Sequence, residues 1–254
     1  MRQNDDDPDA RAAGRFGLRR FPVLTLIVFG ITAVGNALQY VLPGWLPALQ
    51  RTPAGLHGQW WRSGTTLLVQ DGGLLGVLGT LAFLLVLGAL AEQVVSRSAW
   101  LLCFLGAAAA GEIAGYAWQP YGAGKSVGVC GLAAALLVAA LRGAERLPVM
   151  TVPAVLYWCA ALLAGVSVVG AVVAALAGAA TGAALGRGLP VARPGAALGV
   201  VTAVVLTAVT DLHGAAMLAG LVIAVLLAVA ARPDDTGRAG STDPVPGSGA
   251  AAKG

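Results

Sequence analysis

Two side chains of the types used in nucleophilic catalysis stand at the starts of apolar segments. Ser126 opens the apolar run 126–141, and His213 opens the run 213–231. A histidine within hydrogen-bond distance can take the proton of a serine hydroxyl and so activate it as a nucleophile. The chain has only one other histidine, His57. The alternative is that Ser126 caps its helix and that His213 is an interfacial loop residue, with no chemistry between them.

The elements that would position these residues are membrane helices. Hydrophobic residues make up 57% of the chain and charged residues 11%, whereas a soluble domain carries about 25% charged residues. This leaves too little polar surface to cover a water-soluble globule of 254 residues. The composition therefore predicts an all-α fold, a polytopic bundle of transmembrane helices embedded in a lipid bilayer.

The remaining composition argues against several other classes of protein. The net charge is +4, and the basic residues lie between apolar runs, so no nucleic-acid partner is expected. Cys103, Cys130 and Cys159 each fall in an apolar run and form no CxxC pattern. The stretch Gly122-Ala-Gly-Lys-Ser126 lacks the GxxxxGK[ST] spacing of a phosphate-binding loop. We expect neither a metal site nor a cofactor.

The apolar segments predict eight helices, since a spanning helix needs about 20 mostly apolar residues. The run 151–186 would be about 54 Å long as one helix, against an apolar bilayer core of about 30 Å. It is therefore expected to fold as a hairpin that turns near residues 165–170. The other predicted spans are residues 21–41, 72–90, 99–116, 126–141, 195–209 and 213–231.

The polar ends and the basic residues predict the topology. Residues 1–20 and 232–254 are polar and are interpreted as disordered tails around a membrane domain of residues 21–231. Basic residues mark cytoplasmic loops. One set of helix ends holds Arg15, Arg19, Arg20, Arg97, Arg142, Arg146, Arg187, Arg193 and Arg232, whereas the other holds only Arg51, Arg62 and Lys125. A cell-membrane protein with both termini in the cytoplasm is expected, with Ser126 and His213 on the outer side.

Four motifs, in this order along the chain, resemble those of the rhomboid family. Trp61-Arg62 followed by Thr66 is similar to the family's first-loop motif, and Gly88-Ala-Leu-Ala-Glu92 is similar to its GxxxE. The other two are Gly124-Lys-Ser126-Val-Gly-Val-Cys-Gly131-Leu132, similar to the stretch around the family's nucleophile, and Asp211-Leu-His213 with Gly220, similar to its last core helix. The likeness covers about residues 20–232.

The resemblance implies an intramembrane serine protease. Rhomboids use a Ser–His dyad without an Asp, so Ser126 would be the nucleophile and His213 the general base. The reaction would be acyl transfer to water, cutting transmembrane protein substrates near their outer ends. Backbone N–H groups at the start of the Ser126 helix would stabilise the oxyanion. The alternative is a catalytically inactive rhomboid-like protein that binds transmembrane helices.

The sequence departs from the family at several positions. The stretch 72–80 lacks the His and Asn that support the oxyanion in the family, Gln70 stands where a first-loop His is common, and Val127 replaces a Gly. Two rival registers stay open. In one, Gly128-Val-Cys130-Gly131 fits GxSG with Cys130 at the nucleophile position. In the other, Ala175 occupies the position of the base in an AHxxGxxxG helix, and the base is lost.

The first loop should be a folded element at the outer membrane interface. Trp45, Trp60 and Trp61 are expected there, because amphipathic aromatic rings favour the headgroup level. Arg62 should be held by hydrogen bonds within the loop. Its replacement by Ala is expected to destabilise the protein more than replacement of Arg51.

Overall fold

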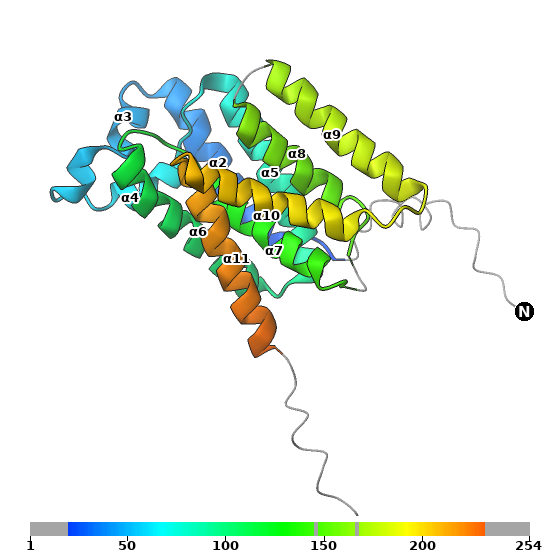
Figure 1. The fold of residues 1–254 in the computed structure, drawn as a ribbon. Coiled ribbons are helices and arrows are strands. Elements are labelled where there is room, and N and C mark those ends of the chain that lie inside the picture. The colour runs from blue at the N-terminus through cyan, green and yellow to red at the C-terminus, as the bar shows by residue number, and fades with distance from the viewer. Residues whose placement is uncertain (1–19, 145–146, 166–167, 232–254) are drawn as a thin grey trace, which may run out of the picture.

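The described part of the computed structural model, residues 20–144, 147–165 and 168–231, is a bundle of α-helices (Figure 1). This confirms the predicted all-α fold. The predicted tails, 1–20 and 232–254, lie outside the described residues except for Arg20. Eight apolar helices form the bundle: α2 (Val23–Val41), α5 (Gly73–Val94), α6 (Arg97–Trp118), α7 (Ser126–Leu141), α8 (Thr151–Ala164), α9 (Val168–Gly186), α10 (Ala192–Ala208) and α11 (Leu212–Ala230).

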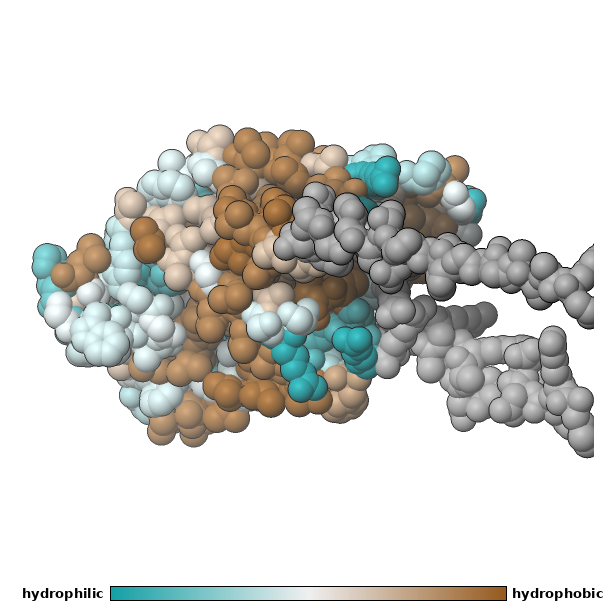
Figure 2. Space-filling view, turned by 90° about the horizontal axis from the view of Figure 1, so that it is seen from below, coloured by the Kyte–Doolittle hydropathy of each residue, from teal (hydrophilic) through white to brown (hydrophobic). Residues whose placement is uncertain are grey.

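The surface of the bundle is apolar over much of its area. Large hydrophobic side chains such as Ile31, Leu78 and Leu226 are more than half exposed, and Figure 2 shows hydrophobic residues spread across the middle of one face. Four helices, α2, α5, α6 and α11, are long and apolar enough to cross a membrane. Soluble monomers rarely expose such large apolar areas. The chain is a multi-pass membrane protein.

The long apolar run 151–186 is divided into two helices, as predicted. α8 ends at Ala164, and Gly165 follows with φ +68°, a positive value that glycine adopts without strain. α9 then runs back along α8 at the edge of the bundle (Figure 1). Gly178 allows a close contact between the two helices. A Cβ atom at this position would lie 3.3 Å from both the carbonyl oxygen of Pro153 and the Cβ of Tyr157.

The central helix is α7, whose residues are all buried except Ala139 and Leu141. It packs against α5, α6, α8, α10 and α11. Glycines allow the closest of these contacts: a Cβ at Gly131 would clash with the backbone oxygen of Cys103 on α6, and one at Gly220 of α11 would lie 2.8 Å from Cα of Gly131. In lipid, such close approach provides the van der Waals contact that holds helices together.

Glu92, the acid of the GxxxE motif, joins α5 to the start of α2. Its carboxylate accepts hydrogen bonds from the backbone N–H of Thr25 at 2.6 Å, from the Thr25 hydroxyl at 2.7 Å and from the N–H of Leu24 at 3.4 Å. The first N–H groups of a helix lack partners within the helix, and Pro22, the N-cap residue, supplies no side-chain bond. Glu92 therefore caps α2 from a neighbouring helix.

The first loop, between α2 and α5, is compact. It contains α3 (Trp45–Leu49), a 3-10 turn η1 (Pro53–Leu56), α4 (Arg62–Thr65) and a second 3-10 turn η2 (Thr66–Leu68). Arg62 donates to the Gln59 side chain at 2.6 Å and to the carbonyls of Pro47 and Gln50 at 2.8 and 2.9 Å. These bonds confirm that Arg62 is held within the loop.

The packing at Gly131 generates a stability prediction. We expect Gly131→Ala to lower the free energy of unfolding by about 1–3 kcal/mol, because the added methyl group must push α6 and α7 apart. Gly30→Ala is the control, since a Cβ there meets nothing within 4 Å. Thermal unfolding in detergent measures both variants. Equal melting temperatures would contradict the close contact between α6 and α7.

Candidate active site

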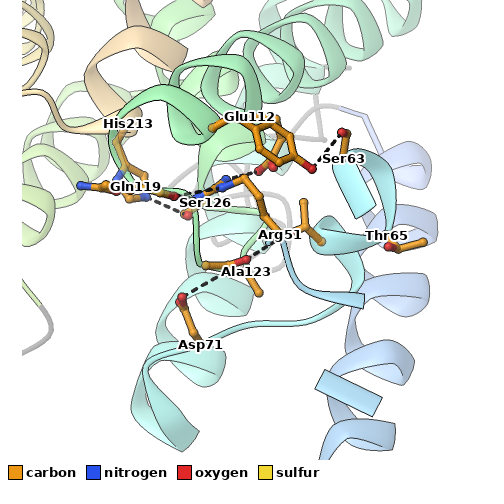
Figure 3. A network of polar contacts seen from close by, with 12 residues as sticks. Arg51, Ser63, Thr65, Asp71, Glu112, Gln119, Ala123, Ser126 and His213 are labelled. Carbon is orange, nitrogen blue, oxygen red and sulfur yellow. Dashed lines mark hydrogen bonds and ion pairs between the residues drawn. The ribbon is translucent and has the colours of Figure 1, made fainter. Parts of the chain in front are cut away.

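Ser126 and His213 face each other across the α7–α11 contact. Ser126 is the first residue of α7, and His213 is the second residue of α11. The distance between Ser126 Oγ and His213 Nε2 is 2.8 Å (Figure 3). A general base must lie within about 2.6–3.2 Å of the hydroxyl that it deprotonates. The two predicted site residues thus have the separation that a nucleophile and a base require.

Asp211 contacts the other side of the His213 ring. Its Oδ1 lies 2.7 Å from His213 Nδ1 and also accepts the backbone N–H of His213 at 2.8 Å. Partial burial raises the pKa of the Asp211 carboxyl, but the hydrogen bonds and charge of His213 outweigh it and hold that pKa below its ordinary value. The carboxylate is therefore ionised at neutral pH. In the sequence, Asp211 is recognisable only as a residue at the start of the last apolar helix.

A cavity of about 410 Å³ opens beside the Ser126–His213 pair. The first loop, α5, α6, α8, the segment before α7 and the start of α11 all contribute to its wall. We call it the site cavity. Its polar lining residues are Arg51, Gln70, Asp71, Thr80, Glu112, Gln119, Tyr121, Ser126, Tyr157, Trp158, Asp211 and His213.

A buried ion pair forms part of the cavity wall. Arg51 Nη1 lies 2.9 Å from Glu112 Oε1 of α6, and both side chains are almost fully buried. Arg51 also donates from Nε and Nη2 to the backbone oxygen of Gln119, at 3.1 and 3.0 Å. The structure favours the reverse of the expectation that Arg62 matters more than Arg51 for stability, because Arg62 is only partly buried in its loop whereas Arg51 is buried and joins that loop to α6.

The segment that leads into Ser126 is bonded to the first loop. The N–H of Ala123 donates to the Asp71 carboxylate at 3.1 Å, and the Asp71 N–H donates back to the Ala123 oxygen at 3.2 Å (Figure 3). One residue further on, the N–H of Gly124 donates to the Thr66 oxygen at 3.1 Å. Ala123 and Gly124, the third and second residues before Ser126, are thus both fixed by the first loop. Neither Asp71 nor Thr66 was identified as a site residue from the sequence alone.

The two rival registers place Cys130 or Ala175 in the site, but neither residue lines the site cavity. Cys130 is fully buried in the hydrophobic core, and Ala175 is exposed on α9. His57 is exposed in the first loop. Among the residues that the structure describes, His213 is therefore the histidine available to Ser126.

The positions at which the sequence departs from the rhomboid pattern, the stretch 72–80, Gln70 and Val127, contribute residues to the wall of the site cavity. In the stretch 72–80 the lining residues are Gly72, Leu75, Gly76, Gly79 and Thr80, and the Thr80 hydroxyl donates to the Gly76 oxygen at 2.8 Å. Gln70 lines the cavity and packs against Gly124, where a Cβ would lie 2.8 Å from its amide nitrogen. Val127 fits because α6 has Gly111 opposite, where a Cβ would lie 2.6 Å from a Val127 methyl group.

Lys125 precedes the nucleophile position and is fully buried. Its Nζ has no hydrogen-bond partner among the described residues. Burial lowers the pKa of the Lys125 ammonium to about 8, because the charged form loses its hydration. From the sequence, Lys125 is recognisable only as one of the few basic residues at the outer ends of the helices, and nothing there indicates its burial.

The Arg51–Glu112 pair generates the second prediction. Arg51→Met should destabilise the protein by about 3–5 kcal/mol, because it leaves Glu112 buried without a counter-charge. The double variant Arg51→Met/Glu112→Leu should recover part of this loss. Arg62→Ala is the control and should cost less. A melting temperature lower for Arg62→Ala than for Arg51→Met would contradict the importance assigned to the buried pair.

Lys125 generates the third prediction, which concerns pH. The folded protein pays the full cost of the buried charge below about pH 8, and the cost disappears as pH rises toward the ordinary lysine pKa of about 10.4. The wild type should therefore gain stability relative to Lys125→Met between pH 7 and pH 10, by at most about 3 kcal/mol. Melting curves of both proteins across this range measure the difference. Parallel curves would contradict the lowered pKa.

Comparison with known families agrees with the motifs. The rhomboid domain family matches residues 57–191, which is more than half of the chain. The match includes Ser126 and ends before His213, so α11 lies beyond it. Comparisons with curated proteins and with solved structures give no match. With its helical membrane bundle and its first-loop, GxxxE and Ser126 motifs, the chain belongs to the rhomboid family.

Proposed function

We propose that this protein is a rhomboid-type intramembrane serine protease that cleaves transmembrane protein substrates. Ser126 is the nucleophile, and His213 is the general base. The observation that supports this most strongly is the 2.8 Å distance between Ser126 Oγ and His213 Nε2 at the edge of a cavity large enough for a peptide segment. Membership of a family that contains such proteases supports the same reaction class.

The reaction proceeds in two acyl-transfer stages. His213 Nε2 takes the hydroxyl proton as Ser126 Oγ attacks the carbonyl carbon of the scissile peptide bond. The tetrahedral intermediate breaks its C–N bond, and His213 returns the proton to the departing amine. A water molecule, deprotonated by His213, then attacks the acyl-enzyme. Cleavage of the ester bond returns a proton to Ser126 and releases the carboxylic acid product.

The oxyanion of each tetrahedral intermediate needs hydrogen-bond donors. The first N–H groups of α7, at Ser126 and Val127, have no acceptor within the helix and lie at the positive end of its dipole. The side chain of Gln70 is the further donor proposed, since it lines the same cavity beside Gly124. One such donor contributes about 10²–10³ to the rate.

The proposed topology has both termini in the cytoplasm of a cell with this protein in its plasma membrane. Arg97, Arg142 and Arg187 then mark the inner ends of helices, and the site lies at the outer end of the bundle. The first loop, which contacts the segment before Ser126, shares that outer end. Substrates would be cut near the outer ends of their membrane segments.

A second candidate function is helix binding without catalysis. The observation that favours it is the scarcity of donors in the stretch 72–80, where the cavity-lining residues are Gly72, Leu75, Gly76, Gly79 and Thr80. A rhomboid-like protein of this kind would hold a transmembrane helix of another protein and leave it intact. Labelling by a serine-reactive probe distinguishes the two functions.

The fourth prediction tests for a reactive serine. A fluorophosphonate probe should label the detergent-solubilised protein covalently, because the His213 base activates the Ser126 hydroxyl toward phosphorus as toward a carbonyl carbon. Ser126→Ala and His213→Ala should both abolish labelling. The measurement is the labelling rate, with mass spectrometry of the modified peptide.

Cys130→Ala is the matched control, since Cys130 lies on the same helix but outside the site cavity. It should react at the wild-type rate. Labelling that survives Ser126→Ala would sink the assignment of the nucleophile. A folded wild-type protein that does not react would favour the non-catalytic function.

A further inference from the structure

We propose that Asp211 positions His213 and completes a Ser126–His213–Asp211 triad in this protein. The inference rests on the proposed function, and it departs from the Ser–His dyad of the family to which the chain is similar. It starts from the contact of 2.7 Å between Asp211 Oδ1 and His213 Nδ1, on the side of the imidazole opposite Ser126.

The contact determines which ring nitrogen of His213 carries the proton. An ionised carboxylate only accepts hydrogen bonds, so Nδ1 of a neutral His213 must be the donor. Nε2 is then unprotonated and faces Ser126 at 2.8 Å. The Ser126 hydroxyl must donate to it. This is the arrangement that a general base needs before the reaction begins.

The same atom of Asp211 does two things at once. Oδ1 caps α11 by accepting the backbone N–H of His213, and it accepts the ring Nδ1–H of the same residue. Asp211 and His213 are only two residues apart, so their contact is set by the first turn of α11 and does not require α7. The imidazole is therefore oriented before a substrate or Ser126 engages it, which reduces the cost of ordering it during the reaction.

Asp211 also acts after proton transfer. When the Ser126 proton moves to Nε2, the imidazolium that forms has a carboxylate at 2.7 Å from its other nitrogen. The carboxylate stabilises that positive charge and stays ionised itself. Asp211 and His213 both line the site cavity, but the role of Asp211 is carried out through the ring, so it is a positioning residue.

A simpler function of Asp211 would be to cap α11. Asn caps a helix as well as Asp does, so Asp211→Asn separates the two functions. The Asn amide can donate to Nδ1 and so favour the opposite tautomer, with the proton on Nε2. Ser96→Ala is the matched control for a lost cap: Ser96 accepts the N–H of Ala99 at the start of α6 and does not line the site cavity.

The experiment has two measurements on the full chain. The first is the labelling rate with the fluorophosphonate probe, which we expect to fall at least about 100-fold in Asp211→Asn, within the range of up to about 10⁴ for such a change in a serine-protease triad. Melting temperature should stay near that of the wild type. Ser96→Ala should melt lower and react at the wild-type rate.

The second measurement is the nitrogen NMR spectrum of histidine-labelled protein with His57→Gln, which leaves His213 as the only histidine. At a pH where the His213 ring is neutral, the spectrum should show the Nδ1–H tautomer, also in Ser126→Ala. Asp211→Asn should populate the Nε2–H tautomer. Equal labelling rates and an unchanged tautomer in Asp211→Asn would overturn the triad and leave the proposed protease function standing.

A wild type that does not react would instead overturn the proposed function, and with it the catalytic role of Asp211. The spectra would still test whether Asp211 determines which ring nitrogen of His213 carries the proton. A tautomer that changes in Asp211→Asn would keep that structural part of the inference, and one that does not change would overturn it as well.

Discussion

The geometry of the site depends on how closely α7 can approach its neighbours. Gly131 meets the backbone of α6 on one side and Gly220 of α11 on the other, and no side chain larger than hydrogen fits at either position. Because α11 lies directly against α7, His213 at the start of one helix can contact Ser126 at the start of the other. A wider crossing would separate the two side chains even if both helices kept their lengths and directions.

Polar contacts at the end of the bundle hold the first loop and the segment before α7, which helix packing alone does not position. The ion pair of Arg51 with Glu112 and the paired hydrogen bonds of Asp71 with Ala123 join the first loop to α6 and to the segment before α7. Arg51, Glu112 and Ala123 are buried, where an unpaired charge or amide would be costly, whereas Asp71 is exposed. The loop thus has few alternative conformations, and the start of α7 is held from outside the helix as well as from within.

Much of the fold could be predicted from the sequence because membrane spans are set by length. The run 151–186 is too long for one crossing, and that alone predicted the break between α8 and α9. Ser126 and His213 were predicted to share a face by counting crossings. Their contact could not be predicted, because it depends on which helices are neighbours and on how closely their glycines let them approach.

The polar environment of the site was the harder part to predict. Arg51 and Glu112 are far apart in the chain, and Arg51 looks like any loop arginine, so the sequence offers no sign that it is buried. Lys125 likewise resembles a surface residue, yet it is buried. Asp211 two residues before His213 matches an ordinary helix cap, and only the position of the imidazole ring reveals its second contact.

The order of the helices also limits how this protein could have arisen. Three helices, α8, α9 and α10, separate α7 from α11, and they run alternately along the bundle (Figure 1). α7 ends at the far end of the bundle from Ser126, so an odd number of helices must follow it to bring the chain back to the end where Ser126 lies. An ancestor or descendant could therefore gain or lose helices in this region only in pairs. Duplication or deletion of a single helix would carry His213 to the opposite end of the bundle, whereas that of a whole hairpin would leave the two residues at the same end.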